Sequence, residues 1–555
     1  MQAHKVLFPL VLLFISHRGT AADLPGAGAQ IQQIPPTPAL TVPRPEIRIM
    51  TAPPGVAPAV DDTRFAVQTL RIQGASIYAV DELLAASGFV PGAEVTLAEL
   101  QAMAQRIAQR YRDAGYVLAQ AYLPPQEVSD GAVNIVVAEG RYGKIASRND
   151  SGLSNALVAD FLGALHAGEP VMLAPLESSL LQLSDLPGIN VSSTLSPGAV
   201  PGTADLLVGL SPGPRVSGSV EADNAGSRYS GVYRAGASLQ VNHLLGFGDA
   251  ASVRGLTSNG GLRYGRLGYE LQAGRVRLGA AYSMLDYRLG REFDILDANG
   301  RASVASLYGS YPLIRSRQTS LHAQLMFERK GLHDRIDAVA SVSDRTVHTL
   351  TASLYGNRRD DLAGGGISTG SLALSAGSVD IQTAQQRQVD ALTALTNGAF
   401  RKLNLNATRQ QQITPQFSLY GALTMQAASK NLITAEKMAL GGVYAVRAYP
   451  EGEAYADQAV LLTVEGRYRL PTQDFLPAQV HLIAFADSAS GKLNKSPWSD
   501  GVRRRTLSGA GLGLTAHENG NYMVRLYYAH RLGTERDTPA PDRDGRFWLQ
   551  AVKFF

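Results

Sequence analysis

The chain contains no cysteine, which excludes disulfide bonds, thiol nucleophiles and thiolate metal sites. Beyond its N-terminal region it has no run of 18 consecutive apolar residues, so helices of the mature chain cannot cross a membrane. Charged residues are sparse at 18%, and 51 basic against 47 acidic residues give a net charge of only +4. No basic stripe with interleaved aromatic residues stands out. Nucleic acid is therefore not an expected partner.

Small and apolar residues are abundant instead. The 555 residues are 45% hydrophobic and include 56 glycines, a composition that suits many strands with small side chains. The length allows two to four domains with ample apolar cores.

The N-terminus has the features of a secretory signal peptide, residues 1–22. His4 and Lys5 precede the apolar run VLFPLVLLFI, and small residues follow at 20–22. A membrane anchor is the alternative, but ten apolar residues are too few for a bilayer of about 30 Å. Residues 23–62 contain PPTP, PRP and APPG, which predicts a semi-rigid, extended linker; whether it also includes a short element such as a plug helix is left open.

Residues 63–142 have the pattern of a small mixed domain. A strand is expected over 65–74, a short helix over DELLAAS, a long amphipathic helix after Thr96, and strands over 117–124 and 133–140. Thr96 and Glu99 have capping-box spacing. The predicted order is strand, helix, helix, strand, strand.

That order, with the phrases RYRDAGYVLAQAYLP and VNIVVAEGRYGKI, resembles a POTRA domain, the periplasmic polypeptide-binding module of outer-membrane protein transporters. A weaker second copy is expected over residues 143–213. Such a domain could offer an uncovered sheet edge to which an extended client adds a strand. A rigid spacer is the alternative.

From residue 214 to 555 the helical period gives way to short alternating runs. In AVLLTVEGRYRL, for example, Val460, Leu462 and Val464 oppose Thr463 and Glu465. An apolar face against a charged face suits a lipid-embedded β-barrel with a wet lumen, although a soluble sandwich shows the same period. Short and long connections alternate back from the C-terminus, which favours an outer-membrane barrel of about 16 antiparallel strands with a periplasmic C-terminus.

Two POTRA-like units, a barrel of this size and the phrase YAVRAYPEGE together resemble two-partner secretion transporters, the TpsB family of hemolysin and filamentous-hemagglutinin exporters. The resemblance implies a lumenal loop, residues 436–457, that folds back into the barrel. It also implies a motif at its tip, here Val446, Arg447, Ala448 and Tyr449. Ala448 stands where the family has glycine, which argues against a turn with positive φ there.

The resemblance further implies an acidic partner for Arg447 in a Phe-x-Asp segment two strands on, which here is Phe485 to Asp487. An aspartate facing lipid would be unfavourable, so Asp487 is expected to face the lumen. The alternative is that Asp487 begins the next loop and Arg447 is solvated. The terminal Phe555 matches the usual signal for the barrel assembly machinery.

Other patterns are read as structural. GAGLG at 509–513 alternates within a strand and predicts close barrel packing rather than dinucleotide binding. The arginines 503–505 are interpreted as loop charges. No catalytic constellation, metal site or cofactor is expected.

The resulting hypothesis is an outer-membrane transporter, with its POTRA domains in the periplasm. It would pass an unfolded partner exoprotein of the hemolysin, adhesin or heme-scavenging type to the cell surface. The alternatives left open are an outer-membrane protein assembly factor, a passive porin and, least of all, an enzyme.

Overall fold

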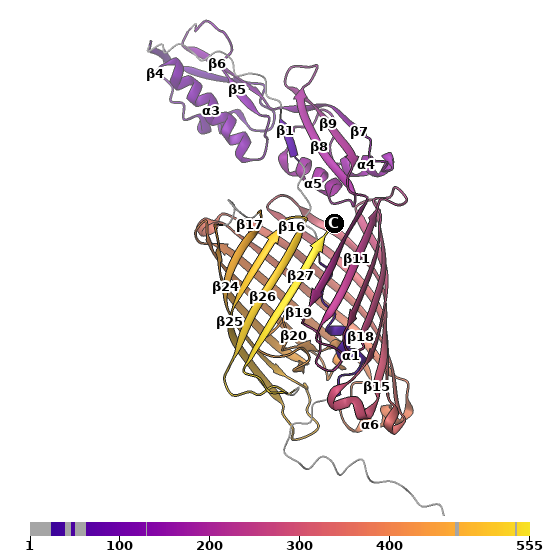
Figure 1. Cartoon of the computed structure of the whole chain (residues 1–555). Coiled ribbons are helices and arrows are strands. Elements are labelled where there is room, and N and C mark those ends of the chain that lie inside the picture. The colour runs from indigo at the N-terminus through magenta and orange to yellow at the C-terminus, as the bar shows by residue number, and fades with distance from the viewer. Residues whose placement is uncertain (1–23, 39–45, 50–62, 129, 472–476, 539–540) are drawn as a thin grey trace, which may run out of the picture.

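Two small α+β units lie at one end of a large β-barrel, and the C-terminus lies at that same end of the barrel (Figure 1). The computed structural model describes residues 24–38, 46–49, 63–128, 130–471, 477–538 and 541–555. The predicted signal peptide lies outside the described residues. Within them, no helix has both the length and the apolar character needed to cross a membrane.

The first unit has the predicted order of strand, helix, helix, strand and strand, with one further strand, β4 (Ala93–Val95), between the two helices. Its elements are β2 (Phe65–Val67), β3 (Thr69–Gln73), α2 (Val80–Ser87), β4, α3 (Leu97–Asp113), β5 (Gln120–Tyr122) and β6 (Ala132–Ala138). The capping box is present: Thr96 Oγ1 accepts from the Glu99 N–H at 3.2 Å, and Glu99 Oε2 accepts from the Thr96 N–H at 2.8 Å. The buried face of α3 is the apolar face of the predicted helix.

Two strand predictions in this unit need correction. The single strand expected over 65–74 is divided at Gln68, because the N–H groups of Gln68 and Thr69 both bond to the Gly131 carbonyl; β2 then pairs with β4, whereas β3 pairs with β6. Of residues 117–124, only β5 is a strand, since a turn closed by the Ala119 N–H and the Tyr116 carbonyl precedes it. Alternation alone does not reveal where a strand changes sheet.

Glu139 is the main polar contact of the first unit. Its carboxylate is 5% exposed and accepts from Ser76 N and Oγ at 2.6 Å, Ile77 N at 2.7 Å and Arg141 Nη2 at 2.9 Å. Burial by itself would raise the pKa of Glu139, but these hydrogen bonds, led by those from Ser76, outweigh it and lower the pKa.

We expect the first unit to lose stability in acid through this carboxylate. Because the pKa is lower in the folded state, the stabilisation is complete above the unfolded value of about 4.3 and is lost as pH falls through the folded value. Glu139→Gln should cost roughly 1–3 kcal/mol at pH 7 and flatten this pH dependence. Hydrogen exchange of the α3 amides in the full chain measures both effects. Glu127→Gln, at an exposed position of the same unit, should change neither.

The second unit is built from β7 (Arg141–Asn149), α4 (Asn155–Leu162), α5 (Leu173–Ser184), β8 (Ile189–Pro197) and β9 (Thr203–Pro212). Its sheet has the order β1-β8-β9-β7, and β1 (Glu46–Ile49) pairs in parallel with β8. The unit therefore takes a strand from the region predicted as linker. It docks on the barrel through α5 and the residue after it, where Arg315 Nε and Nη2 contact the Asp185 carboxylate at 2.6 and 2.7 Å.

The barrel is closed by antiparallel pairing of its first and last strands, β10 and β27. This confirms the predicted barrel of about 16 antiparallel strands. Of the 16 strands observed, 11 precede the lumenal loop and five follow it. Its strands are β10 (Val216–Asp223), β11 (Arg234–Asn242), β12 (Ala250–Ser258), β13 (Arg263–Ala273), β14 (Val276–Arg288), β15 (Ala298–Arg315), β16 (Thr319–Ile336), β17 (Ser341–Asp360), β18 (Gly366–Ile381), β19 (Gly398–Gln412), β20 (Phe417–Ala428), β23 (Gln458–Arg469), β24 (Gln479–Lys492), β25 (Arg504–Glu518), β26 (Tyr522–Leu532) and β27 (Gly545–Phe554).

The remaining short elements lie in the connections. They are η1 (Arg291–Leu296), η2 (Asp337–Val339), η3 (Leu362–Gly364), α6 (Ala384–Leu392), η4 (Thr434–Glu436), β21 (Met438–Ala439) and β22 (Tyr455–Ala456). Connections at the end near the α+β units are mostly short, such as residues 274–275, and those at the far end are longer, such as residues 533–544. The predicted alternation of lengths is confirmed.

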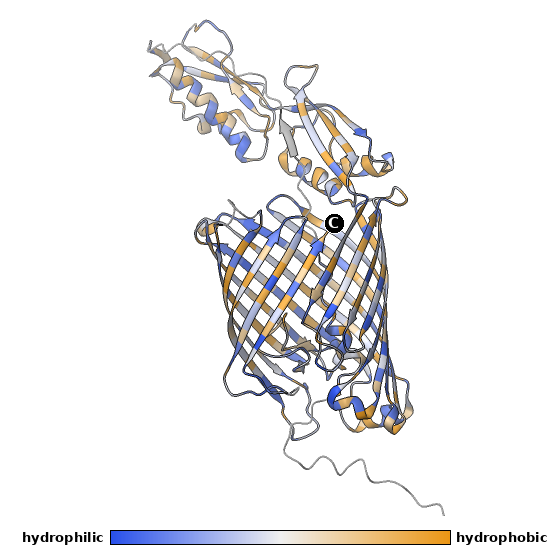
Figure 2. Cartoon of the chain, in the orientation of Figure 1, coloured by the Kyte–Doolittle hydropathy of each residue, from blue (hydrophilic) through white to orange (hydrophobic). Residues whose placement is uncertain are grey.

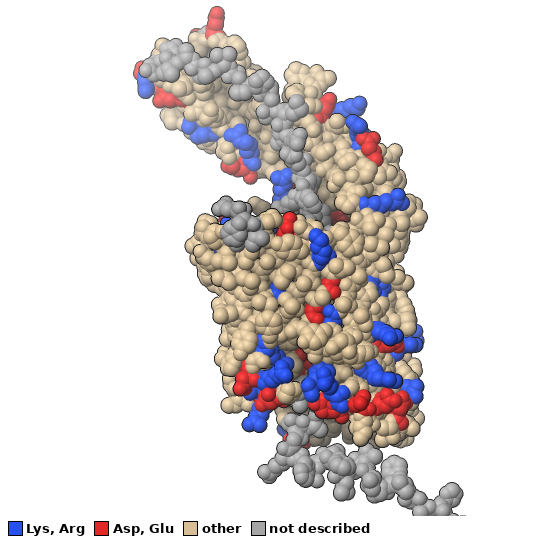
Figure 3. Space-filling model, viewed as in Figure 1, with Lys and Arg blue, Asp and Glu red and all other residues tan. Residues whose placement is uncertain are grey.

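The outer wall is apolar. Val460, Leu462 and Val464 of β23 are 40–49% exposed on the outside, while Glu465 on the opposite face is 5% exposed. Apolar and polar residues alternate along the barrel strands in Figure 2. On the face seen in Figure 3, most charged side chains of the barrel gather at the end away from the α+β units. An apolar exterior with charges inside is what lipid contact requires, which rules out the soluble sandwich.

A short helix lies inside the barrel, α1 (Ala27–Gln32) (Figure 1). Its first N–H donates to Asp334 Oδ1 on β16 at 2.6 Å, and Gln32 Nε2 donates to the carbonyls of Thr434 and Lys437 at 2.5 and 2.8 Å. The prediction of an extended linker over 23–62 is therefore wrong for this part. The proline-free run AGAQIQ forms a helix because the barrel wall and the lumenal loop supply its packing and polar contacts.

Candidate functional site

The connection between β20 and β23, residues 429–457, folds back into the lumen; we call it the lumenal loop. It begins earlier than the predicted residue 436. Its tip is closed by β21 pairing with β22, and Val446, Ala448 and Tyr449 are all fully buried. They pack against Phe485 and Ile483 of β24 and Leu507 of β25. The barrel wall is thus what covers this glycine-bounded, apolar segment.

Arg447 contacts Asp487 inside the lumen. The guanidinium donates from Nε to Oδ2 and from Nη2 to Oδ1, both at 2.8 Å, and the Arg447 N–H also donates to Oδ2 at 3.2 Å. The Arg447 and Asp487 side chains are 6% and 0% exposed. This is a two-point, charge-assisted contact away from water. Asp487 lies within β24, facing inward, and does not begin the next loop.

A second carboxylate shares the guanidinium. Glu465 of β23 meets Arg447 Nη1 at 2.8 Å and Arg467 Nη2 at 2.7 Å. The guanidinium carbon lies 3.5 Å from the centroid of the Phe485 ring, a cation–π contact that gives the phenylalanine of the Phe-x-Asp segment a direct role. Glu465 is on the charged face predicted for its strand, but its sharing of Arg447 was not predicted, because a pairing across strands depends on register.

Two further contacts fix the motif to the last part of the barrel. Trp548 Nε1 of β27 donates to the Arg447 carbonyl at 2.7 Å, and the Tyr449 hydroxyl donates to the Glu535 carbonyl at 3.0 Å. The backbone of the motif is therefore held by β27, and the Tyr449 side chain by the connection between β26 and β27.

Ala448 does not have a positive φ, so its backbone does not require the glycine found in the family. Space for the Ala448 methyl group is provided instead by glycines of β25. A Cβ at Gly509 of β25 would lie 2.4 Å from the Ala448 Cβ, and one at Gly511 would lie 2.5 Å from the Phe485 ring. These alternating glycines make room for the motif, which gives the predicted packing role of GAGLG its structural basis.

Gly509→Ala should therefore displace the motif by overpacking, at a cost of about 1–3 kcal/mol. Ala448→Gly should relieve the closest conflict, so the double variant should regain most of the wild-type structure, with only the 3.2 Å approach to the His530 carbonyl left. Fluorescence of Trp548, whose indole bonds to Arg447, reports the change in a Trp498→Phe background. Gly421→Ala serves as a control, because nothing lies within 4 Å of its added Cβ. Equal spectra for all four chains would contradict the packing argument.

One of the three arginines interpreted as loop charges has another role. Arg505 is only 9% exposed, and its Nη2 contacts Glu453 Oε1 of the lumenal loop at 2.8 Å. Glu453 also accepts from the Thr538 N–H at 2.9 Å, which links the lumenal loop to the connection between β26 and β27. The loop-charge interpretation is wrong for Arg505, because β25 begins at Arg504 and turns Arg505 inward.

The part of the lumenal loop that leads from β20 to the tip, which we call the first limb, is held by a separate ion cluster. The Glu436 carboxylate, 1% exposed, contacts Lys330 Nζ of β16 and Lys402 Nζ of β19, each at 2.7 Å. Helix α1 packs on this limb so closely that a Cβ at Gly28 would lie 2.9 Å from the Ala435 nitrogen. Nothing in the sequence indicated this cluster, since its members are brought together only by barrel closure.

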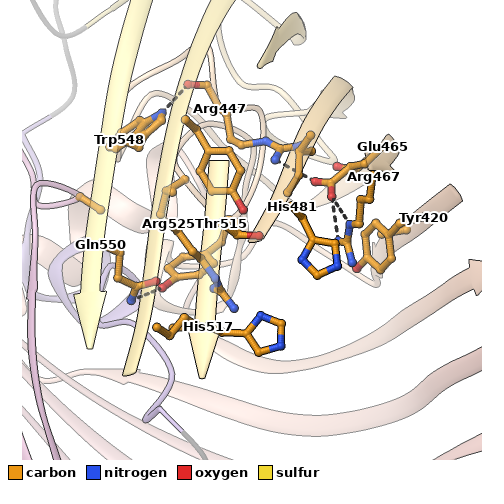
Figure 4. A pocket seen from close by; sticks show the side chains of 18 of the residues that line it. Tyr420, Arg447, Glu465, Arg467, His481, Thr515, His517, Arg525, Trp548 and Gln550 are labelled. Atoms are coloured by element: carbon orange, nitrogen blue, oxygen red, sulfur yellow. Dashed lines mark hydrogen bonds and ion pairs between the residues drawn. The ribbon is translucent and has the colours of Figure 1, made fainter. Parts of the chain in front are cut away.

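A cavity of about 790 Å³ lies beside the motif in the lumen (Figure 4). Its lining includes Tyr420, Arg447, Glu465, Arg467, His481, His517, Arg525, Trp548 and Gln550. The rings of His481 and His517 are stacked with centroids 5.8 Å apart. Within the described part of the chain, no group of three or more His, Asp or Glu side chains is arranged to hold a metal ion. The cavity is contiguous with the motif, and its lining mixes apolar with polar and charged side chains.

The last residue, Phe555, extends the pairing of β10 with β27 that closes the barrel. The Phe555 carbonyl accepts from the Gly218 N–H at 2.9 Å, and the Phe555 N–H donates to the Gly218 carbonyl at 3.1 Å. Phe555 is 61% exposed. Its role as an assembly signal stays a prediction.

Comparisons with known proteins agree with this architecture. Residues 202–516 match the family model of the haemolysin secretion/activation protein ShlB/FhaC/HecB, and residues 65–140 match a POTRA domain of the ShlB type. The heme/hemopexin transporter protein HuxB of Haemophilus influenzae is 30% identical over 471 residues, covering 84% of this chain and 82% of the relative. The outer membrane transporter CdiB of Escherichia coli is 24% identical over 467 residues, covering 82% and 76%.

The solved structure of CdiB from Escherichia coli superposes with a TM-score of 0.70 at 21% identity, covering 91% of this chain and 93% of that one. Barrel, POTRA domain and lumenal loop define an outer-membrane transporter of polypeptides. The chain belongs to the ShlB/FhaC/HecB family, whose members carry out two-partner secretion. It therefore resides in the outer membrane, with POTRA in the periplasm, and exports a partner exoprotein.

Proposed function

We propose that the chain captures an unfolded exoprotein in the periplasm and passes it through the lumen, and that the Arg447–Asp487 contact is the lock that passage must release. The contact itself carries the proposal. It joins a loop lying within the lumen to the fixed wall through two charge-assisted hydrogen bonds at 2.8 Å. Opening it would leave buried charges uncompensated, so a closed and an open position of the loop would differ by a large free energy.

The class of client follows from the named relatives. One relative is a heme/hemopexin transporter and another is a CdiB transporter. A heme-scavenging exoprotein is accordingly the first candidate, with hemolysins and adhesins next. The 30% identity to the heme/hemopexin relative over most of both chains supports this order.

Capture is assigned to the two α+β units, with the second acting as another POTRA domain. Strands β3 and β5 are the edges of the first unit's sheet, and β7 is an edge of the second. An extended client could add a strand there through main-chain hydrogen bonds. Insertion through the barrel assembly machinery by way of Phe555, and lipid contact along the apolar wall, belong to the same proposal.

Co-expression with a candidate exoprotein tests the function. The client should reach the medium only when the transporter is present, and client lacking its transporter should remain in the periplasm. Should depletion instead lower the amounts of other outer-membrane proteins while export continues, the chain would be an assembly factor. Small-solute flux with no dependence on a client would indicate a porin.

A further inference from the structure

The segment after α1 runs along the inner wall of the first three barrel strands. Every second residue of this segment contacts an arginine of the wall. Arg234 Nη1 of β11 donates to the Gln33 carbonyl at 2.6 Å, and Arg254 Nη1 of β12 donates to the Pro35 carbonyl at 2.7 Å. Arg254 Nη1 also reaches Thr37 Oγ1 at 3.3 Å. Gln33 is the helical C-cap of α1, and beyond it Pro35 and Thr37 both face the wall, two residues apart, as in the extended backbone that consecutive prolines favour.

Both arginines are held in place by buried carboxylates of β10. Arg234 Nε lies 2.8 Å from Asp223 Oδ1, and Arg254 Nη2 lies 2.5 Å from Glu221 Oε1, with all four side chains at most 5% exposed. Glu221 reaches Arg254 across β11 over Gly236, where a Cβ would lie 2.9 Å from Oε1. The two guanidiniums therefore present donors in fixed positions, and the contacts to residues 33 and 35 use only main-chain carbonyls.

Two polar atoms of this site are left without a partner among the described residues, Oε1 of Gln33 in the resident segment and Oε2 of Glu221 on the wall. Among the residues that the structure describes, the buried Oε2 of Glu221 has no hydrogen-bond partner, although the residue is only 5% exposed. In an extended chain the N–H and C=O of one residue point to the same side. An N–H at position 35 would therefore face the same wall as the Pro35 carbonyl, but proline has none to donate.

We propose that Arg234, Arg254 and Glu221 form a binding track for extended polypeptide backbone, and that residues 33–37 occupy it as a displaceable stand-in for the transported chain. The inference rests on the proposed export function and places one contact of the client on the wall of β10–β12. Carbonyl recognition is independent of sequence, as an exporter of a long unfolded chain requires. A client residue other than proline would satisfy Glu221 and so bind better than the resident segment.

The test uses the full chain in detergent micelles with a photoreactive benzoylphenylalanine at Ser252, two residues before Arg254 on β12. The probes are biotinylated nine-residue peptides of residues 30–38, as wild type and with Pro35→Ala or Pro36→Ala. Pro35→Ala should raise cross-linking about tenfold at equal concentration, because it adds one hydrogen bond to a charged acceptor. Pro36→Ala should match the wild type, since its N–H would point away from the wall.

Glu221→Gln in the transporter should abolish the preference for the Pro35→Ala peptide, and Arg254→Gln should reduce cross-linking of all three. The heat-dependent electrophoretic shift of the barrel verifies that both variants are folded. Equal cross-linking of the two alanine peptides, or none by any peptide, would overturn the track. Export of a co-expressed client is scored separately, so loss of the track with intact export refutes this inference alone.

Discussion

Arg447→Ala should abolish export of the partner exoprotein while leaving the barrel in the outer membrane. The substitution leaves Asp487 buried without a cation and removes the ion pair between Arg447 and Glu465. Loss of one partner of a buried pair costs about 3–5 kcal/mol, enough to shift the loop between positions by a factor of a hundred or more. Client in the medium, quantified against transporter in the membrane fraction, measures the effect.

Arg503→Ala is the matched control. Arg503 is an arginine immediately before β25. Its side chain is 65% exposed and pairs with an exposed Asp500 at 3.3 Å. Export should be unchanged. Arg447→Lys should give an intermediate loss, because an ammonium cannot make both contacts to Asp487 and reach Glu465. Wild-type export by Arg447→Ala would show that the contact is structural and not a lock.

Glu436→Ala should loosen helix α1 and make the outer membrane permeable. It removes the carboxylate shared by Lys330 and Lys402 and leaves two ammonium groups on the lumenal wall, both at most 16% exposed. The limb that carries Thr434 and Lys437, to which Gln32 is hydrogen-bonded, then loses its ion pairs to β16 and β19. We expect larger and longer single-channel openings in planar bilayers and greater sensitivity of cells to large hydrophilic antibiotics.

Glu328→Gln provides the comparison for this second prediction. Glu328 also pairs with Lys330, at 3.5 Å, but this ion pair does not involve the lumenal loop. The Glu328 side chain is 21% exposed, whereas that of Glu436 is 1% exposed. The conductance of the Glu328→Gln variant should equal that of the wild type. If Glu436→Ala also showed closed channels, the wall contacts of α1 and Gln33, from Asp334, Ser230 and Arg234, would be enough to hold the helix.

Several parts of this protein follow from local sequence. The capping box at Thr96 and Glu99 and the apolar face of α3 need only neighbouring residues, and the structure has both. The alternation in β23 fixes which side chains meet lipid, because a strand has only two faces. Alternating short and long connections were enough for strand number and orientation, since each turn returns the chain to the other side of the membrane.

The contacts that join distant segments do not follow from local pattern. Helix α1 lacks the length and the cap that mark a helix in a sequence, and it exists because the barrel encloses it. The inward position of Arg505, the sharing of Arg447 by Glu465, and the Glu436 cluster all depend on barrel closure and strand register.

The sequence by itself determined that this chain is a lipid-facing barrel with a polypeptide-binding unit before it and an arginine-tipped loop inside it. The period of the strands and the lengths of their connections can be read from neighbouring residues, and they predict the barrel. The resemblance to a known family added the POTRA domain and the lumenal loop. Beyond the pairing of Arg447 with Asp487, only the tertiary structure decided what that loop contacts and what fills the lumen. Closing sixteen strands brings residues separated by up to some four hundred positions within hydrogen-bonding distance, as with Gln32 and Lys437.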